Sequence, residues 1–164
     1  MTNQIYSVET PIGQFRYATK HKTVVAASFA DKWGRLSQRR YGDDRTSETG
    51  QSGPWDAILK NYFDGRDNKL DDIPCAADGT HFQQLVWKQL RRIPAGSRAT
   101  YGDVAAAINH PKAARAIGQA NNRNPISVIV PCHRVVAASG LGGYGGGLER
   151  KRWLLDLEAR LHCV

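Results

Sequence analysis

Cys132 and His133 are adjacent in the chain and follow a largely apolar run, residues 126–130, that ends at Pro131. A thiol is nucleophilic only as the thiolate, and a neighbouring histidine is a common base for forming it. Such a histidine needs an acceptor that orients its ring. Glu158 sits at the edge of a later helical apolar face, where it either partners a buried histidine or arginine or stays exposed. The first role is favoured, so these residues predict an activated cysteine.

The elements that position the cysteine lie on both sides of it. The apolar run stands between two prolines and has the length of a strand, so we expect a short buried strand that carries Cys132 at its end. Residues 137–147 form a glycine-rich loop whose backbone amides can approach a ligand closely. A final helix is expected over residues 148–161, with its leucines facing a core and Glu158 beside them.

Three more helices are expected before the cysteine. The first covers residues 80–93 and opens with a capping-box pattern at residues 80–83. His81 at this helix start is interpreted as a solvated or capping residue, not as a metal ligand. Residues 101–108 and 112–122 form two short helices joined by a tight turn, which in a basic protein makes a helix-turn-helix candidate.

The helix over residues 112–122 carries one long cation, Arg115, among very small residues. A helix that reads base edges in the major groove carries several long polar side chains, so this one suits close approach to a backbone or a narrow groove better. Helix propensity and tight packing of the alanines remain an alternative reason for this composition.

The N-terminal half has a different pattern. Residues 5–29 alternate as about three antiparallel strands, and residues 54–65 form a short helix that covers them. Residues 31–53 are polar and are expected to form an exposed, mobile loop. Residues 68–79 supply one further candidate strand and a polar linker, so we place a domain boundary there.

Charge and cysteine content limit the class of protein. We expect the 164 residues to form two domains, 1–78 and 79–164. With 23 Lys+Arg against 15 Asp+Glu, the net charge of +8 favours a polyanionic partner such as nucleic acid, with a merely soluble basic protein as the alternative. Three cysteines without CxxC spacing indicate neither a disulfide framework nor a zinc site. No signal peptide or membrane-spanning run is evident, so we expect a soluble cytoplasmic protein with no metal, no other cofactor and no membrane partner.

Together these motifs resemble the O6-alkylguanine-DNA alkyltransferases, also called methylated-DNA–protein-cysteine methyltransferases, over residues 80–160. The matching residues are Phe82-Gln83, Val86-Trp87, Ile93-Pro94-x-Gly96, Thr100-Tyr101-Gly102, Ala113-Ala114-Arg115-Ala116, Asn124-Pro125, Pro131-Cys132-His133-Arg134-Val135 and Tyr144-Gly-Gly-Gly147. The N-terminal half is similar more loosely, through residues 10–13 and 62–65. The resemblance implies a two-domain α+β fold: an N-terminal, ribonuclease-H-like small sheet with a covering helix, and a mostly helical C-terminal domain that binds DNA and accepts the alkyl group.

The resemblance implies repair of DNA by direct reversal of alkylation damage. An alkyl group passes irreversibly, once per chain, from O6 of guanine in duplex DNA to Cys132 after the base is flipped out through the minor groove. O4-alkylthymine is a second candidate substrate. The implied partner is double-stranded DNA that carries alkylated guanine, bound by a monomer, with cooperative assembly on DNA left open.

Roles for individual residues also follow from the resemblance. His133 is the base, Glu158 orients it, Tyr101 gives a proton or hydrogen bond to the leaving guanine, and Asn124 ties a turn to the site. DNA contacts are expected from Arg115, Ala113, Ala114, Gly118 and Thr100. The guanine pocket is bordered by Val135, Tyr144 and Gly145. Arg134 is interpreted as part of a structural ion pair, with a DNA contact as the alternative.

Two rival hypotheses remain open from the sequence. One is a thiol hydrolase that turns over with Cys132, His133 and Glu158; the other is a non-enzymatic helix-turn-helix DNA-binding protein. The short loop before Tyr144, and Gly145 where some relatives carry serine, leave the pocket size and the tolerated alkyl group open.

Overall fold

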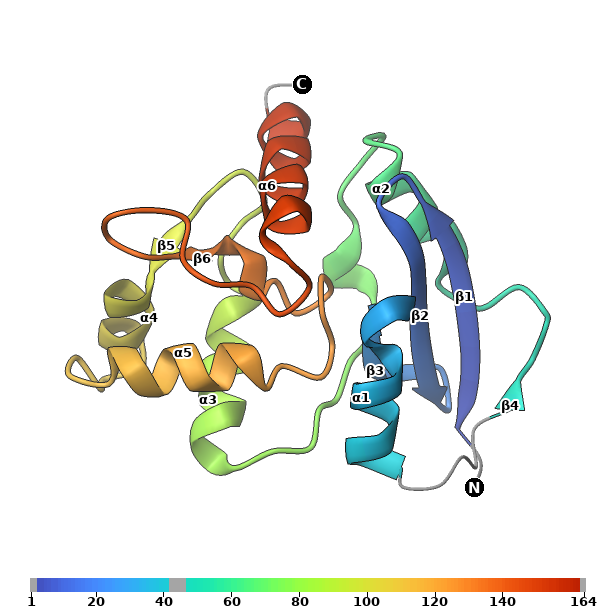
Figure 1. The fold of residues 1–164 in the computed structure, drawn as a ribbon, viewed down its shortest axis with the longest axis horizontal. Coiled ribbons are helices and arrows are strands. Elements are labelled where there is room, and N and C mark those ends of the chain that lie inside the picture. Colours follow the sequence, from blue (N-terminus) through green and yellow to red (C-terminus); the bar gives the residue numbers. More distant parts are fainter. Residues whose placement is uncertain (1–2, 42–46, 163–164) are drawn as a thin grey trace. The chain divides into compact units, whose positions relative to one another are not determined.

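The computed structural model describes residues 3–41 and 47–162, which fold into two compact units (Figure 1). The first unit contains residues 1–77 and 125–129, and the second contains the rest of the chain. Cys163 lies outside the described residues, as do residues 42–46 of the predicted loop. Within the described ranges, no helix combines the length and the apolar character that a membrane span requires.

The first unit is built on a meander of three antiparallel strands, as predicted for residues 5–29. The strands are β1 (Gln4–Thr10), β2 (Gly13–Lys20) and β3 (Thr23–Phe29), with β4 (Ser47–Glu48) parallel to β1 at the edge, in the order β3-β2-β1-β4. His21 and Lys22 link β2 to β3 with φ values of 50° and 69°, the left-handed conformation that tight hairpin turns need.

Helix α2 (Asp56–Phe63) covers one face of this sheet, as predicted. The ring of Phe63 lies 5.5 Å from that of Phe15 and 6.2 Å from that of Phe29. A buried hydrogen bond fixes the start of the helix, because the Tyr17 hydroxyl donates to Asp56 Oδ1 at 2.7 Å. Aromatic packing and this bond together hold the helix on the sheet.

Helix α1 (Ala30–Tyr41) corrects the prediction of a mobile loop over residues 31–53. Trp33 is 5% exposed and packs with Leu36 in a cluster that also holds Ile5, Ala18 and Ala26. These strand residues share one face because side chains alternate along a strand. Among the side chains of α1 that the structure describes, two large apolar ones, Trp33 and Leu36, pack against the sheet and most others are polar. The helical period is therefore faint in the sequence, and burial against the sheet stabilises the helix.

The strand predicted within residues 68–79 is replaced by a 3₁₀ turn, η1 (Leu70–Asp72), and a single parallel bridge between Cys75 and Val24. Val24 both donates to the Pro74 carbonyl at 2.8 Å and accepts from the Ala76 amide at 2.9 Å. The segment therefore pairs along β3 for one residue only.

The second unit is mostly helical. Its elements are α3 (His81–Leu90), β5 (Ala99–Thr100), α4 (Tyr101–Ala107), α5 (Ala114–Asn122), η2 (Cys132–Arg134), β6 (Val135–Val136) and α6 (Leu148–His162). Thr80 and Gln83 form the predicted capping box of α3. Helices α3, α4 and α5 pack on one another, and the Trp87 indole on α3 donates to the Ala120 carbonyl on α5 at 3.0 Å. The assignment of residues 101–122 as a helix-turn-helix remains a prediction. The ribonuclease-H-like fold of the N-terminal half also remains a prediction.

The predicted strand that would carry Cys132 does not form. Residues 126–130 are buried except for Ser127, but they bridge to β3 only at Ile126 and then turn. Val128 has φ +69° and the Ile129 amide bonds to the Ser127 carbonyl, a tight turn that breaks strand pairing. Cys132 is thus the first residue of a 3₁₀ turn.

Candidate active site

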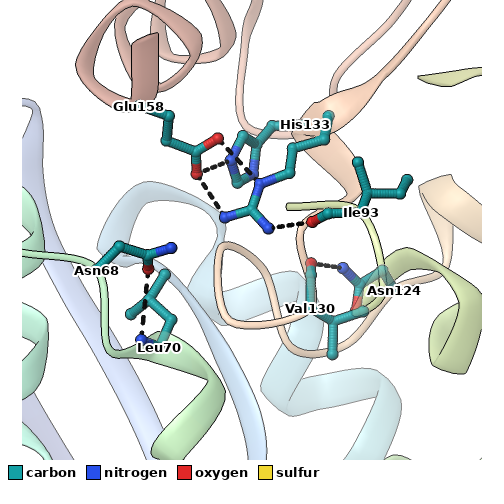
Figure 2. Close-up of polar contacts among 8 residues, drawn as sticks. Asn68, Leu70, Ile93, Asn124, Val130, His133 and Glu158 are labelled. Atoms are coloured by element: carbon teal, nitrogen blue, oxygen red, sulfur yellow. Dashed lines mark hydrogen bonds and ion pairs between the residues drawn. The ribbon is translucent and has the colours of Figure 1, made fainter. Parts of the chain in front are cut away.

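Cys132 is held at the start of η2 by the turn that precedes it. Its side chain is 7% exposed. The Asn124 amide donates to the Val130 carbonyl at 2.8 Å (Figure 2) and also hydrogen-bonds to the thiol. Asn124 stands two residues after the last residue of α5, so its side chain links the end of that helix to the cysteine by a bond to the backbone, as the resemblance implied.

The thiol is neutral at rest. Burial raises the pKa of Cys132, and the Asn124 hydrogen bond and the charge of Lys151 offset this only in part. A buried thiol of this kind is a poor nucleophile until a base removes its proton. The site therefore needs a base within reach of the sulfur.

His133 and Glu158 lie beside the cysteine and are both fully buried. His133 Nε2 lies 2.7 Å from Glu158 Oε1 (Figure 2). Burial alone would raise the pKa of Glu158, but His133 and Arg134 together hold it well below its usual value near 4.5. The carboxylate is therefore ionised and accepts the Nε2 proton, which confirms the predicted partnership between Glu158 and a buried histidine.

This hydrogen bond determines which nitrogen of the ring is available. With Nε2 donating to the carboxylate, the neutral ring carries its lone pair on Nδ1. Nδ1 is buried and has no hydrogen-bond partner among the described residues. The tautomer assigned from this network leaves Nδ1 as the proton acceptor.

Arg134 forms an ion pair with Glu158, in agreement with the structural ion pair expected from the sequence. Its Nε donates to Glu158 Oε2 at 2.9 Å and its NH2 donates to Glu158 Oε1 at 2.8 Å. Its NH1 donates to the Ile93 carbonyl after α3 at 2.6 Å (Figure 2). The guanidinium thus connects the end of α3 with α6.

Lys151 is a site residue that the sequence reasoning missed. Its side chain is 0% exposed, and Nζ donates to the carbonyls of Val135 and Gly143 at 2.7 and 2.9 Å. Burial lowers the pKa of Lys151, while its interaction with Cys132 favours the charged form. The signal was present, because Lys151 precedes Glu158 by seven residues and therefore shares its helix face.

Tyr101 begins α4 and lies between two glycines. A Cβ on Gly142 (φ +73°) would stand 2.9 Å from the Tyr101 hydroxyl, and one on Gly118 would stand 3.8 Å from the ring. Gly142 belongs to the glycine-rich loop and Gly118 to α5. The glycine-rich loop can therefore approach the Tyr101 hydroxyl this closely because residue 142 is a glycine.

Tyr144 and Gly145 follow in the same loop. The Tyr144 ring lies 6.4 Å from the His133 ring, and its buried hydroxyl has no hydrogen-bond partner among the described residues. Burial raises the pKa of Tyr144 well above its usual range, so its hydroxyl stays protonated. Gly145 is exposed, and a Cβ there would meet nothing within 4 Å. Val135 is fully buried and pairs with Ala99 through β6 and β5.

The residues expected to contact DNA lie around α5. Arg115 and Ala114 are exposed, and Ala113 and Gly118 are half-buried. The Thr100 hydroxyl accepts a hydrogen bond from the Asp103 amide and so caps α4. Of the chain's charged residues, 12 of the 23 Lys and Arg but 5 of the 15 Asp and Glu fall in the second unit, which thus carries +7 of the formal charge of +8. The unit that holds the buried cysteine is the one suited to a polyanion.

Metal ligands do not gather in this site. Over residues 3–41 and 47–162, no group of three or more His, Cys, Asp or Glu side chains could hold a metal ion.

Comparisons with known proteins give matches to one named family. Residues 81–160 match the family described as 6-O-methylguanine DNA methyltransferase, DNA binding domain. The methylated-DNA–protein-cysteine methyltransferase of Shigella flexneri is 48% identical over 127 residues, which cover 77% of this chain and 74% of that protein. The protein of the same name from Mycobacterium bovis is 43% identical over 156 residues, 93% of this chain and 90% of that one.

A solved structure supports the same assignment for the fold. The crystal structure of Mycobacterium tuberculosis OGT in complex with DNA has a TM-score of 0.82 and 36% sequence identity, and the alignment covers 96% of this chain and 94% of that chain. Identity at this level over most of both chains shows that the chain belongs to the methylated-DNA–protein-cysteine methyltransferase family.

Proposed function

We propose that this protein repairs alkylated DNA by transferring the alkyl group from O6 of guanine to the sulfur of Cys132. The observation that carries this proposal is the buried Cys132 beside His133, whose ring is hydrogen-bonded to Glu158, in a chain of this family. A soft thiolate is well suited to displacement at a saturated carbon.

His133 acts as the base for the thiol. Its Nδ1 takes the S–H proton through an intervening water, since Nδ1 makes no direct bond to another described residue. Glu158 holds the ring in place while the proton moves. The sulfur then forms a bond to the alkyl carbon as the bond from that carbon to guanine O6 breaks.

Guanine leaves more easily if it is protonated or hydrogen-bonded as the bond to its O6 breaks, because its free anion is a poor leaving group. Tyr101, whose hydroxyl lies against Gly142, donates a proton or hydrogen bond to it and so lowers the barrier. Carbonyls of Cys132 and Val135 and the amide near Gly145 read the guanine edge. The Val135 carbonyl already accepts from Lys151, and its second lone pair is available for the base.

The product explains why the protein acts once. Sulfur and the alkyl carbon form a thioether, which water does not hydrolyse as it does a thioester. Each chain therefore accepts one alkyl group, and a thiol hydrolase that turns over is not favoured.

DNA reaches the site by base flipping, at a cost of a few kcal/mol. Helix α5 lies in the minor groove, with Arg115 in the base stack and Ala113, Ala114, Gly118 and Thr100 along the backbone. We propose a monomer in the cytoplasm that acts on genomic DNA, with alkylated guanine as substrate and O4-alkylthymine as a second one.

Intact-mass analysis after incubation with duplex DNA that carries O6-methylguanine tests the reaction. We expect a gain of about one methylene, mapped to Cys132, and no second gain with excess DNA. The matched control is Cys75→Ser, which should still take up the group, whereas Cys132→Ser should not. Repaired DNA beside unmodified protein would refute the proposal and favour a hydrolase. Sequence-selective binding of undamaged DNA, unchanged in Cys132→Ser, would favour a regulator.

A further inference from the structure

His133 and Arg134 share one acceptor. Glu158 Oε1 lies 2.7 Å from His133 Nε2 and 2.8 Å from Arg134 NH2, and Oε2 takes a second bond from the Arg134 Nε at 2.9 Å. The guanidinium therefore engages both carboxylate oxygens, whereas the imidazole engages one. Such a two-point pair is among the strong charge-assisted contacts in proteins.

The sharing has an electrostatic consequence. A carboxylate beside a histidine favours the protonated, charged ring. Here the negative charge of Glu158 is already balanced by Arg134, which is 3% exposed and cannot lose its proton. A proton added to His133 while Cys132 keeps its own proton would place a second positive charge beside one buried carboxylate, away from water that could screen it. A proton taken from Cys132 leaves a thiolate that balances the new charge on the ring.

None of the other described groups around the His133 ring adds a negative charge that would favour its protonated form. From η2 come Cys132, which is neutral at rest, and Arg134; α6 contributes Glu158 and the cation Lys151. The loop contributes Tyr144, which stays protonated. The turn after α3 presents the Ile93 carbonyl, and that carbonyl accepts from Arg134.

We propose that Arg134 is a positioning residue for the alkyl transfer: it occupies the charge of Glu158, so that the carboxylate orients His133 without charging it and Nδ1 stays free to accept the Cys132 proton. This inference rests on the proposed function. The arginine thus separates two effects of a carboxylate on a histidine, orientation and protonation. Its third bond, to Ile93, fixes the guanidinium so that it cannot swing away from Glu158.

The wild-type protein offers a direct test that needs no activity. In ¹⁵N-histidine spectra recorded at pH 7, His133, assigned by comparison with His133→Gln, should show one protonated and one bare nitrogen, with the proton on Nε2. The exposed His81, His110 and His162 give reference signals in the same samples. A doubly protonated His133 at pH 7, or a proton on Nδ1, would overturn the proposal.

Kinetics on variants provide the second test. Single-turnover alkyl transfer, followed by intact mass against pH, should give Arg134→Met an acid limb shifted upward by about one to three pH units, the range for loss of a neighbouring charge. Arg134→Lys keeps the charge, so the position of its acid limb should stay near that of the wild type. The exposed control Arg92→Met should leave the acid limb unchanged as well. A uniform loss at every pH would indicate a merely structural role and would reject the proposal, as would a downward shift.

The two experiments also separate this inference from the proposed function. If the wild-type protein takes up no alkyl group, the proposed function fails, while the spectra still report the charge and tautomer of His133. If Arg134→Met does not fold, the wild-type spectra decide alone.

Discussion

Replacing Glu158 with glutamine isolates the contribution of one buried charge to the fold. The carboxylate accepts three hydrogen bonds from His133 and Arg134, and all three residues are buried. The amide of a glutamine at this position would direct its NH₂ group toward the N–H groups of His133 or Arg134. It would also leave the guanidinium without a negative charge to balance it. Removing one partner of a buried ion pair costs about 3–5 kcal/mol, a large part of the roughly 5–15 kcal/mol that stabilises a typical domain.

The cost should depend on pH in a defined direction. Because the pKa of Glu158 is held below its usual value near 4.5, its stabilising effect is complete above pH 4.5 and is lost as the pH falls. In that range the unfolded chain binds one proton that the folded chain does not. The free energy of unfolding of the wild type should therefore approach that of Glu158→Gln by about 1.4 kcal/mol for each pH unit below 4.5.

Urea denaturation at pH 7 and at pH 3, followed by fluorescence and circular dichroism, measures both quantities. The control is Asp156→Asn, an exposed carboxylate on the same helix, which should change stability by less than about 0.5 kcal/mol. We expect the gap between wild type and Glu158→Gln to narrow by about 2 kcal/mol between the two pH values. A gap below about 1 kcal/mol at pH 7, or one that does not narrow, would contradict an ionised, stabilising Glu158.

Three further outcomes are expected. Arg115→Ala should slow repair of duplex DNA at least about tenfold, while reaction with free O6-benzylguanine changes little, because only the duplex requires base flipping; equal losses in the two rates would remove Arg115 from that role. Asn124→Ala should raise the pKa of Cys132, seen as slower iodoacetamide labelling at pH 7, and should cost about 1–3 kcal/mol in urea denaturation through the buried carbonyl left unpaired. Lys151→Met should also raise the pKa of the Cys132 thiol, because the nearby positive charge is removed. Iodoacetamide labelling of Cys132 should then be lost at pH 7 and return at pH 9. The exposed control Lys88→Met should be labelled like the wild type.

The residues with strong periodic patterns were predicted well. The alternation over residues 5–29 and the three-and-four spacing in α3 and α6 reflect burial of one face, which local sequence encodes directly. Glu158 could be assigned to a buried histidine because it interrupts such a face. The capping box at Thr80 also depends only on neighbours in the chain.

Other features depend on contacts that are distant in sequence. Helix α1 has a narrow apolar face, and its stability comes from the sheet that Trp33 packs against. The turn at Val128 was missed because a β-branched residue with positive φ opposes local preference and is imposed by its surroundings. Lys151 shares the helix face of Glu158, but a lysine is rarely buried, and the Val135 and Gly143 carbonyls that stabilise its burial come from segments outside its helix.

Residues 125–129 fold with the first unit, although they lie between α5 and Cys132 in the sequence. The amide of Ala27 bonds to the Pro125 carbonyl, and the Ser127 amide bonds to the Ala27 carbonyl, each at 2.9 Å. A chimera that exchanges the N-terminal half for that of a relative must therefore keep the surface of β3 that receives this segment. Only Val130 and Pro131 separate this segment from Cys132, so the chain that leads to the nucleophile is folded as part of the first unit.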